Sequence, residues 1–131
     1  MRFLLDANVV IALGKEDPRI FSKVLQHGFG QCALSAIVLH ELYYGAFKGS
    51  LTERSLENVE ALPFDVLDFN RDDARAAGEI RATLHRAGEP IGPYDTLIAG
   101  QALARDLTMV TRNVREFPRL AGLRVEDWES G

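Results

Sequence analysis

Residues 2–13, RFLLDANVVIAL, contain the change of pattern that decides the fold. The apolar run at residues 3–5 stops at Asp6, and apolar residues then return with helical spacing. Asp6 therefore stands where a strand passes into a helix. Side chains at the carboxyl ends of parallel strands line the crevice in which ligands bind, so Asp6, with Asn8 beside it, is a candidate for chemistry. The alternative is that Asp6 only caps the following helix, a common role for aspartate.

The rest of the chain alternates between apolar runs of strand length and segments with helical periodicity. Further strands are expected near residues 31–34, 64–69, 107–110 and 123–125. Further helices are expected to begin at Pro18, after Ser35, at Thr52, after Asn70 and at Tyr94. This alternation predicts an α/β fold with a mainly parallel sheet covered by helices on both faces.

The composition is that of an ordinary globular protein. With 131 residues, 47% of them hydrophobic and 26% charged, the chain fits one domain spanning residues 1–131. It shows neither the basic and apolar pattern of a signal peptide nor a run of about 18 apolar residues, so we expect a cytoplasmic protein without a membrane anchor. The one cysteine, Cys32, has no partner for a disulfide and no metal-ligand spacing, and is assigned no role.

Four acidic residues stand out by position. Asp6 closes the first strand, Glu41 interrupts an apolar helical face, Asp95 lies in the first turn of a helix, and Glu116 follows the fourth strand after a short loop. Each has a simpler interpretation. Glu41 could pair with a cation such as Arg81, Asp95 could interact with the helix dipole, and Glu116 could be a solvated loop residue. For Glu41 this is the weaker reading, because burying a lone carboxylate is costly.

Several motifs together resemble one family. They are LLDANVVIAL (4–13), SAIVLHELYYGA (35–46), GEIRATL (78–84) followed by PIGPYDTLIAGQA (90–102), and VTRNVREFPRLAGLRVEDW (110–128). This set resembles the PIN-domain ribonucleases, most closely the VapC-type toxins of bacterial toxin–antitoxin pairs. The similarity covers nearly the whole chain.

The resemblance implies a PIN-like three-layer α/β/α sandwich whose five-stranded, mainly parallel sheet has the first strand at its centre. It also implies a homodimer and a VapB-type antitoxin as partner. The family's acidic metal site falls here on Asp6, Glu41, Asp95 and, in a more variable position, Glu116. Thr111 and Asn113 match the polar pair that supports that site, whereas Ala7 stands where the family usually has Thr or Ser.

The chemistry of these acids can also be argued from their ligand preferences. Carboxylate oxygens suit Mg²⁺ or Mn²⁺, and Mg²⁺ binds one or two carboxylates while keeping several waters. The three histidines, His27, His40 and His85, lack partners at zinc-ligand spacing and are read as structural or exposed, with His40 turned away from the face of Glu41. A metal on Asp6 and Asp95 would activate water for in-line attack on RNA, leaving 5′-phosphate and 3′-hydroxyl ends.

The charge balance permits a nucleic-acid substrate. The chain carries 19 acidic and 15 basic residues, and setting the four site acids aside leaves equal numbers. Three basic residues follow the fourth strand and are candidates for phosphate contacts, although a solvated basic loop is an equal alternative: Arg112, Arg115 and Arg119. Tyr43, Tyr44 and Tyr94 could stack on unpaired bases, but the first two are more often core or dimer residues.

Two other function classes are considered. A phosphoacceptor domain also clusters acids at strand ends, but it needs a cation for the phosphoryl group, and this chain has no lysine after Lys48. The remaining alternative is an inactive PIN-like interaction module. The presence of all four acids argues against it, and a metal-dependent cleavage assay separates the two.

Overall fold

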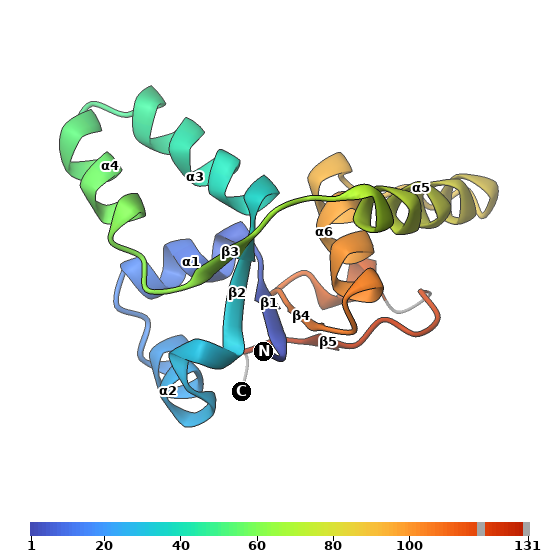
Figure 1. Ribbon diagram of the computed structural model, residues 1–131, viewed down its shortest axis with the longest axis horizontal. Helices are drawn as coiled ribbons and strands as arrows, with labels where there is room; N and C mark the ends of the chain where they lie inside the picture. The colour runs from blue at the N-terminus through green and yellow to red at the C-terminus, as the bar shows by residue number, and fades with distance from the viewer. Residues whose placement is uncertain (118–119, 130–131) are drawn as a thin grey trace.

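A parallel sheet forms the centre of the molecule. The structure, a computed structural model, describes residues 1–117 and 120–129. Its strands are β1 (Phe3–Leu5), β2 (Cys32–Ser35), β3 (Asp65–Leu67), β4 (Thr108–Val110) and β5 (Val125–Glu126). The described residues form one five-stranded sheet in the order β3-β2-β1-β4-β5, and every pairing is parallel. The central position predicted for the first strand is therefore confirmed (Figure 1).

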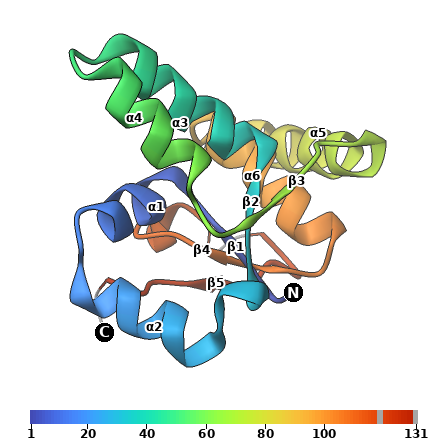
Figure 2. The ribbon, with the colours of Figure 1, turned by 60° about the vertical axis from the view of Figure 1, so that its left-hand side comes forward.

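Helices cover both faces of this sheet. They are α1 (Ala7–Gly14), α2 (Pro18–His27), α3 (Ala36–Lys48), α4 (Thr52–Glu60), α5 (Arg71–Arg86) and α6 (Pro93–Ala104), with short 3₁₀ turns η1 (Phe29–Gln31) and η2 (Val114–Glu116). One face packs against α1 and α2, and the other against α5, α6 and the beginning of α3. The three-layer sandwich is confirmed. The α3–α4 hairpin extends beyond the sheet as an arm (Figures 1 and 2).

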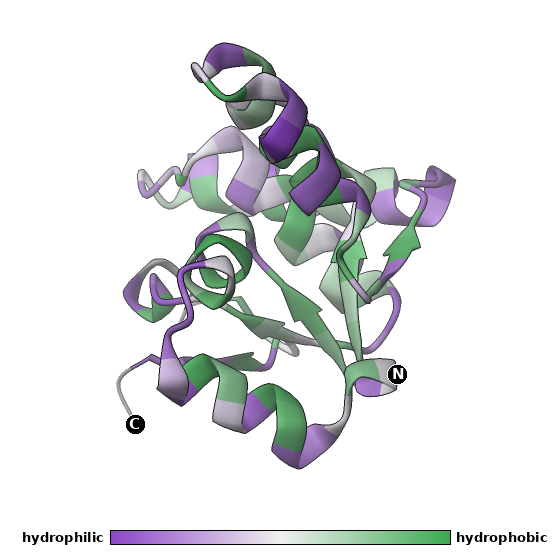
Figure 3. Cartoon of the chain, turned by 90° about the vertical axis from the view of Figure 1, so that its left-hand side faces the viewer, coloured by the Kyte–Doolittle hydropathy of each residue, from purple (hydrophilic) through white to green (hydrophobic). Residues whose placement is uncertain are grey.

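The alternation of side chains along each strand creates two separate cores. In β1, Phe3 and Leu5 pack with α1 and α2, whereas Leu4 packs with α5 and α6. Strands covered on both faces read as continuous apolar runs, which is why FLL has no polar residue (Figure 3). This double burial holds β1 in place immediately before Asp6.

Three helices begin with a side-chain cap at the positions where the sequence predicts a helix start. The side chains of Asp6, Ser35 and Asn70 accept hydrogen bonds from backbone N–H groups of Val9, Ile37 and Asp73, at 3.0, 3.0 and 3.1 Å. Each bond satisfies an N–H group that has no partner within its helix. The helices α1, α3 and α5 thus begin where the sequence placed them.

The strand bounds differ most at the sheet edge. The strand predicted at 64–69 is only Asp65–Leu67, because β3 pairs with β2 alone and its chain soon leaves for α5. The strands predicted at 31–34, 107–110 and 123–125 are shifted or shortened by one or two residues. Within the described residues, no helix is both long and apolar enough to span a membrane.

Candidate active site

Asp6 is buried at the carboxyl end of the central strand. Its residue is 3% exposed, and its Oδ1 accepts the N–H of Val9 at 3.0 Å. Burial raises the pKa of this carboxyl, although hydrogen bonds from Thr111 and Val9 and the charge of Arg112 act in the opposite direction. The capping interpretation is thus correct, but it accounts for one oxygen of a carboxylate that is costly to ionise.

Glu41 lies near Asp6 although the two are 35 positions apart in the sequence. Ser35 caps α3 at the end of β2, and Val38 of the same helix packs into the core. One turn later, Glu41 is half-buried. Burial raises its pKa, and the negative charge of Asp6 raises it further, while His40 lowers it. The tertiary fold therefore brings these two carboxylates together with like charges.

Asp95 lies in the first turn of α6, as predicted. Its carboxylate lies over the backbone of Gly92, where an added Cβ would stand 3.5 Å from Oδ2. The residue is half-buried. Glu116 ends the 3₁₀ turn η2, and its side chain lies outside the part that the structure describes. The predicted role of Glu116 therefore stays a prediction.

Thr111 connects the fourth strand with the first. Leu5 pairs with Val110, so the residues that follow them, Asp6 and Thr111, lie side by side, and the Thr111 side chain hydrogen-bonds Asp6. Thr111 is fully buried, and its hydroxyl oxygen accepts the backbone N–H of Asn113 at 3.1 Å. The Asn8 backbone also hydrogen-bonds the Asp6 carboxyl.

The donor set favours a hard cation. Asp6 and Glu41 offer oxygen atoms, and their raised pKa values mark negative charge that a cation would stabilise. Across residues 1–117 and 120–129, no group of three His, Cys, Asp or Glu side chains is arranged around a single point. The carboxylates of Asp6 and Glu41 fit Mg²⁺ by their ligand type, because Mg²⁺ commonly binds one or two carboxylates and keeps several waters.

Comparison with known proteins assigns the chain to a family. The PIN domain matches residues 3–123. The chain belongs to the PIN-domain family. It is 42% identical over 130 residues to the tRNA(fMet)-specific endonuclease VapC of Shigella flexneri, with 98% of each chain covered. It is 37% identical over 131 residues to ribonuclease VapC2 of Haemophilus influenzae strain Rd, again with 98% of both chains covered.

Solved structures agree with this assignment. DNA-bound VapBC from Salmonella typhimurium contains a chain that matches with a TM-score of 0.91 and 40% identity, and 98% of each chain is covered. VapBC-1 from nontypeable Haemophilus influenzae matches with a TM-score of 0.88 and 33% identity, covering 98% of both chains. The resemblance of this PIN domain to VapC-type proteins, stated from motifs alone, is confirmed.

The basic residues after β4 have different surroundings. Arg112 lies near Asp6, whose pKa its charge lowers, and its Nη1 is 3.9 Å from Oε2 of Glu129. Arg115 is exposed on η2. Arg119 lies outside the described residues. Of the three candidate phosphate contacts, Arg112 is the one shown beside an acid of the candidate site.

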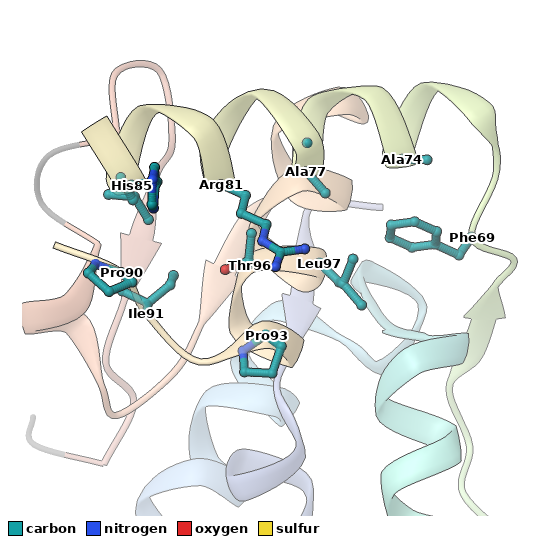
Figure 4. Close-up of a pocket in the computed structure, with 12 residues that line it drawn as sticks. Phe69, Ala74, Ala77, Arg81, His85, Pro90, Ile91, Pro93, Thr96 and Leu97 are labelled. Atoms are coloured by element: carbon teal, nitrogen blue, oxygen red, sulfur yellow. The ribbon is translucent and has the colours of Figure 1, made fainter. Parts of the chain in front are cut away.

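The pairing of Glu41 with Arg81 considered from the sequence is wrong. Glu41 lines the pocket beside Asn8, and the charges that act on its pKa are those of Asp6 and His40. Arg81 lies on α5 and lines a separate, mainly apolar pocket between α5 and α6, where its side chain extends toward Thr96 and Leu97 (Figure 4). Glu41 is therefore available to the candidate active site beside Asp6.

Sequence reasoning misplaced His40 relative to this site. His40 was expected to turn away from the face of Glu41, because neighbouring helix residues point in different directions, yet both line one pocket. Tyr94, at the start of α6, lines the same pocket, and its ring centroid lies 5.6 Å from that of His40. Tyr94 is a stacking candidate from the sequence, but its contact with His40 joins two helices that are far apart in the chain and has no local sequence signal.

Proposed function

We propose that this PIN domain is a Mg²⁺-dependent endoribonuclease, with Mn²⁺ able to substitute, and the toxin of a VapC-type toxin–antitoxin pair. The observation that carries the proposal is the buried Asp6 carboxylate at the end of β1 beside a second carboxylate, Glu41. Full-length similarity to proteins named VapC endonuclease and ribonuclease supports it.

The acidic residues are proposed to bind the metal, and a basic residue is proposed to contact the RNA. Asp6 and Asp95 are proposed as direct ligands, with Glu41 and Glu116 orienting water around them. A bound divalent cation supplies the positive charge that activates water and stabilises the leaving oxygen of a phosphodiester. Thr111 holds Asp6 in place, and Arg112 lies close enough to meet a phosphate that approaches it.

We propose initiator tRNA as the first substrate to test, because the relatives from Shigella and Salmonella are named for tRNA(fMet). The assay incubates initiator tRNA and an elongator tRNA with the chain, with EDTA and then with excess Mg²⁺ or Mn²⁺. We expect cleavage only with the metal and 5′-phosphate ends, and Asp6→Asn serves as the inactive control. Cleavage that persists in EDTA, or 2′,3′-cyclic phosphate ends, would contradict the mechanism, and metal-loaded protein that cuts no RNA would favour the inactive interaction module.

A VapB-type antitoxin is proposed as the partner that blocks this site. Solved structures named VapBC contain chains similar to this one along 98% of its length. A free nuclease would harm its host, so we expect an antitoxin segment that presents Arg or Lys to Asp6 and Glu41. Co-purification followed by a cleavage assay tests this, and a tight complex that still cuts RNA at the free rate would disprove the blocking role.

A homodimer remains part of the proposal. The pocket between α5 and α6, about 590 Å³ and largely apolar, supplies a surface that a second copy could cover (Figure 4). Light scattering on the purified chain should give twice the monomer mass, and a monomer at all concentrations would remove this element of the proposal.

A further inference from the structure

A pocket of about 800 Å³ opens directly beside the acids. Residues of α1, α3 and α6 line it, among them Asn8, His40, Glu41, Tyr44 and Tyr94. Because Glu41 and Asn8 belong both to this pocket and to the surroundings of Asp6, the pocket continues the candidate active site.

Its aromatic residues are exposed. Tyr44 is 62% and Tyr94 is 46% exposed, and neither belongs to the two hydrophobic cores. Their positions are nevertheless supported by neighbours. The ring of Tyr94 contacts His40, and the ammonium of Lys48 lies 5.0 Å from the ring centroid of Tyr44. Flat rings held at the surface next to a reaction centre are suited to stacking.

The charges around the site favour a base in this pocket and a phosphate outside it. Glu41 lines the pocket and would repel a phosphate, whereas Arg112 lies on the β4 side of Asp6 and does not line it. A nucleobase is neutral and flat, and stacking on aromatic side chains is the usual way proteins bind unpaired bases.

We propose that this pocket is a subsite for one unpaired nucleobase next to the scissile phosphate, stacked against Tyr94 and Tyr44. The inference rests on the proposed ribonuclease activity. It requires the nucleotide at this position to leave any base pair, so cleavage would be confined to single-stranded segments such as loops.

The test combines protein variants with abasic substrates. Tyr94→Leu and Tyr44→Leu keep an apolar side chain but remove the ring, and Tyr94→Phe keeps the ring. Phe47→Leu is the matched control, since Phe47 is 65% exposed on the same helix as Tyr44 but does not line the pocket. Steady-state cleavage of a single-stranded oligonucleotide carrying the mapped cut site is measured, with an abasic nucleotide placed at each position around the cut.

In the wild type, we expect one abasic position to raise KM about tenfold, the loss typical of one stacked base, with a smaller change in kcat. Tyr94→Leu should raise KM on the intact substrate by a similar factor, and in this variant the abasic nucleotide at that position should change KM very little. Tyr94→Phe and Phe47→Leu should behave as wild type.

If the wild type cuts RNA but the Leu variants keep its KM and its abasic pattern, the subsite is disproved while the proposed nuclease activity stands. Leu variants that cut normally yet lose the antitoxin would assign the pocket to the partner and also overturn the inference. A wild type that cuts no RNA overturns the proposed function itself.

Discussion

The Asp6 carboxylate has two roles that its position makes compatible. One oxygen caps α1 through the N–H of Val9, while burial and the nearby Glu41 make the negative charge costly. Asn at this position keeps an oxygen for the cap and removes the charge. We therefore expect Asp6→Asn to keep or raise the stability of the metal-free protein at pH 7, while RNA cleavage and stabilisation by Mg²⁺ are lost.

Thermal melts of both proteins in EDTA and in Mg²⁺ check this prediction. A loss of apo stability greater than about 1 kcal/mol would show that the charge of Asp6 is paired in the folded state. A variant that still cuts RNA would show that capping is the main role of this residue.

The same carboxyls make stability depend on pH in a stated direction. Burial raises the pKa of Asp6 above its ordinary 3.8 and that of Glu41 above 4.5, so the folded state holds these protons more tightly than the unfolded chain. Their contribution to stability is therefore present at low pH and is lost as the pH rises through the folded pKa values. The difference in unfolding free energy between Asp6→Asn and wild type should grow in favour of the variant from about pH 4 upward; a difference that shrinks would contradict the raised pKa.

The pKa of Asp73 is shifted in the opposite direction, below its ordinary value. It is fully buried, and although burial alone would raise its pKa, hydrogen bonds from Arg105, the Asn70 backbone and Gln101 lower it. Its Oδ2 is 2.9 Å from Nη2 of Arg105. We expect Asp73→Ala to lower the free energy of unfolding by about 3 kcal/mol, because it removes the carboxylate that pairs with Arg105 and leaves Arg105 and Gln101 to share the carbonyl oxygen of Asp68 as an acceptor.

Urea denaturation measures this loss, and Asp72→Ala, an exposed change in the same turn, should cost at most about 0.5 kcal/mol. Since the folded pKa of Asp73 is lowered, its contribution is present above the ordinary pKa of 3.8 and is lost as the pH falls through the folded value. Equal losses for the two variants would mean that the buried pair contributes nothing.

At the scale of elements, the contact between α5 and α6 depends on one glycine. A Cβ built on Gly100 would lie 2.5 Å from Cα of Ala77, a distance that requires the two helices to separate. Gly100→Ala should therefore destabilise the protein by about 1–3 kcal/mol despite the better helix propensity of alanine.

Gly78 on α5 provides the matched control. It is exposed, and an added Cβ would meet nothing within 4 Å, so Gly78→Ala should stabilise by up to about 1 kcal/mol. Opposite signs in urea denaturation support close helix packing at Gly100, and two stabilising substitutions would refute it.

At the scale of the whole molecule, the C-terminal segment packs against both β1 and α2. Trp128 is 2% exposed, lies edge-on to Phe3 at 5.1 Å between ring centroids, and stacks on His27 at 5.4 Å. Its Nε1 donates to Glu126 at 3.0 Å. We expect Trp128→Ala to lower unfolding stability by about 3–5 kcal/mol and Trp128→Phe by clearly less.

Circular dichroism must report this unfolding, because the variants lack the only tryptophan of the chain. Glu129, next in sequence, lies beside Arg112, so removing the ring should also weaken RNA cleavage. A Trp128→Ala protein with wild-type stability would show that the segment is not part of the core.

The local features of this protein followed from the sequence alone. The change from FLL to helical spacing located Asp6, and capping residues placed the starts of α1, α3 and α5, because hydrogen bonds between near neighbours decide these points. The motifs were sufficient to indicate the family. The central position of the first strand also followed, but from that resemblance and not from periodicity.

Contacts between distant segments were decided only by the tertiary structure. Asp72 and Asp73 share the first turn of α5, yet Asp72 is exposed whereas Asp73 is buried and accepts hydrogen bonds from Gln101 of α6 and from Arg105, which follows that helix. The proximity of Glu41 to Asp6, and the meeting of His40 with Tyr94, likewise require helices from separate parts of the chain to converge at one end of the sheet. Periodicity records which face of a helix is apolar, but the partner of each polar side chain depends on how the helices pack on the sheet.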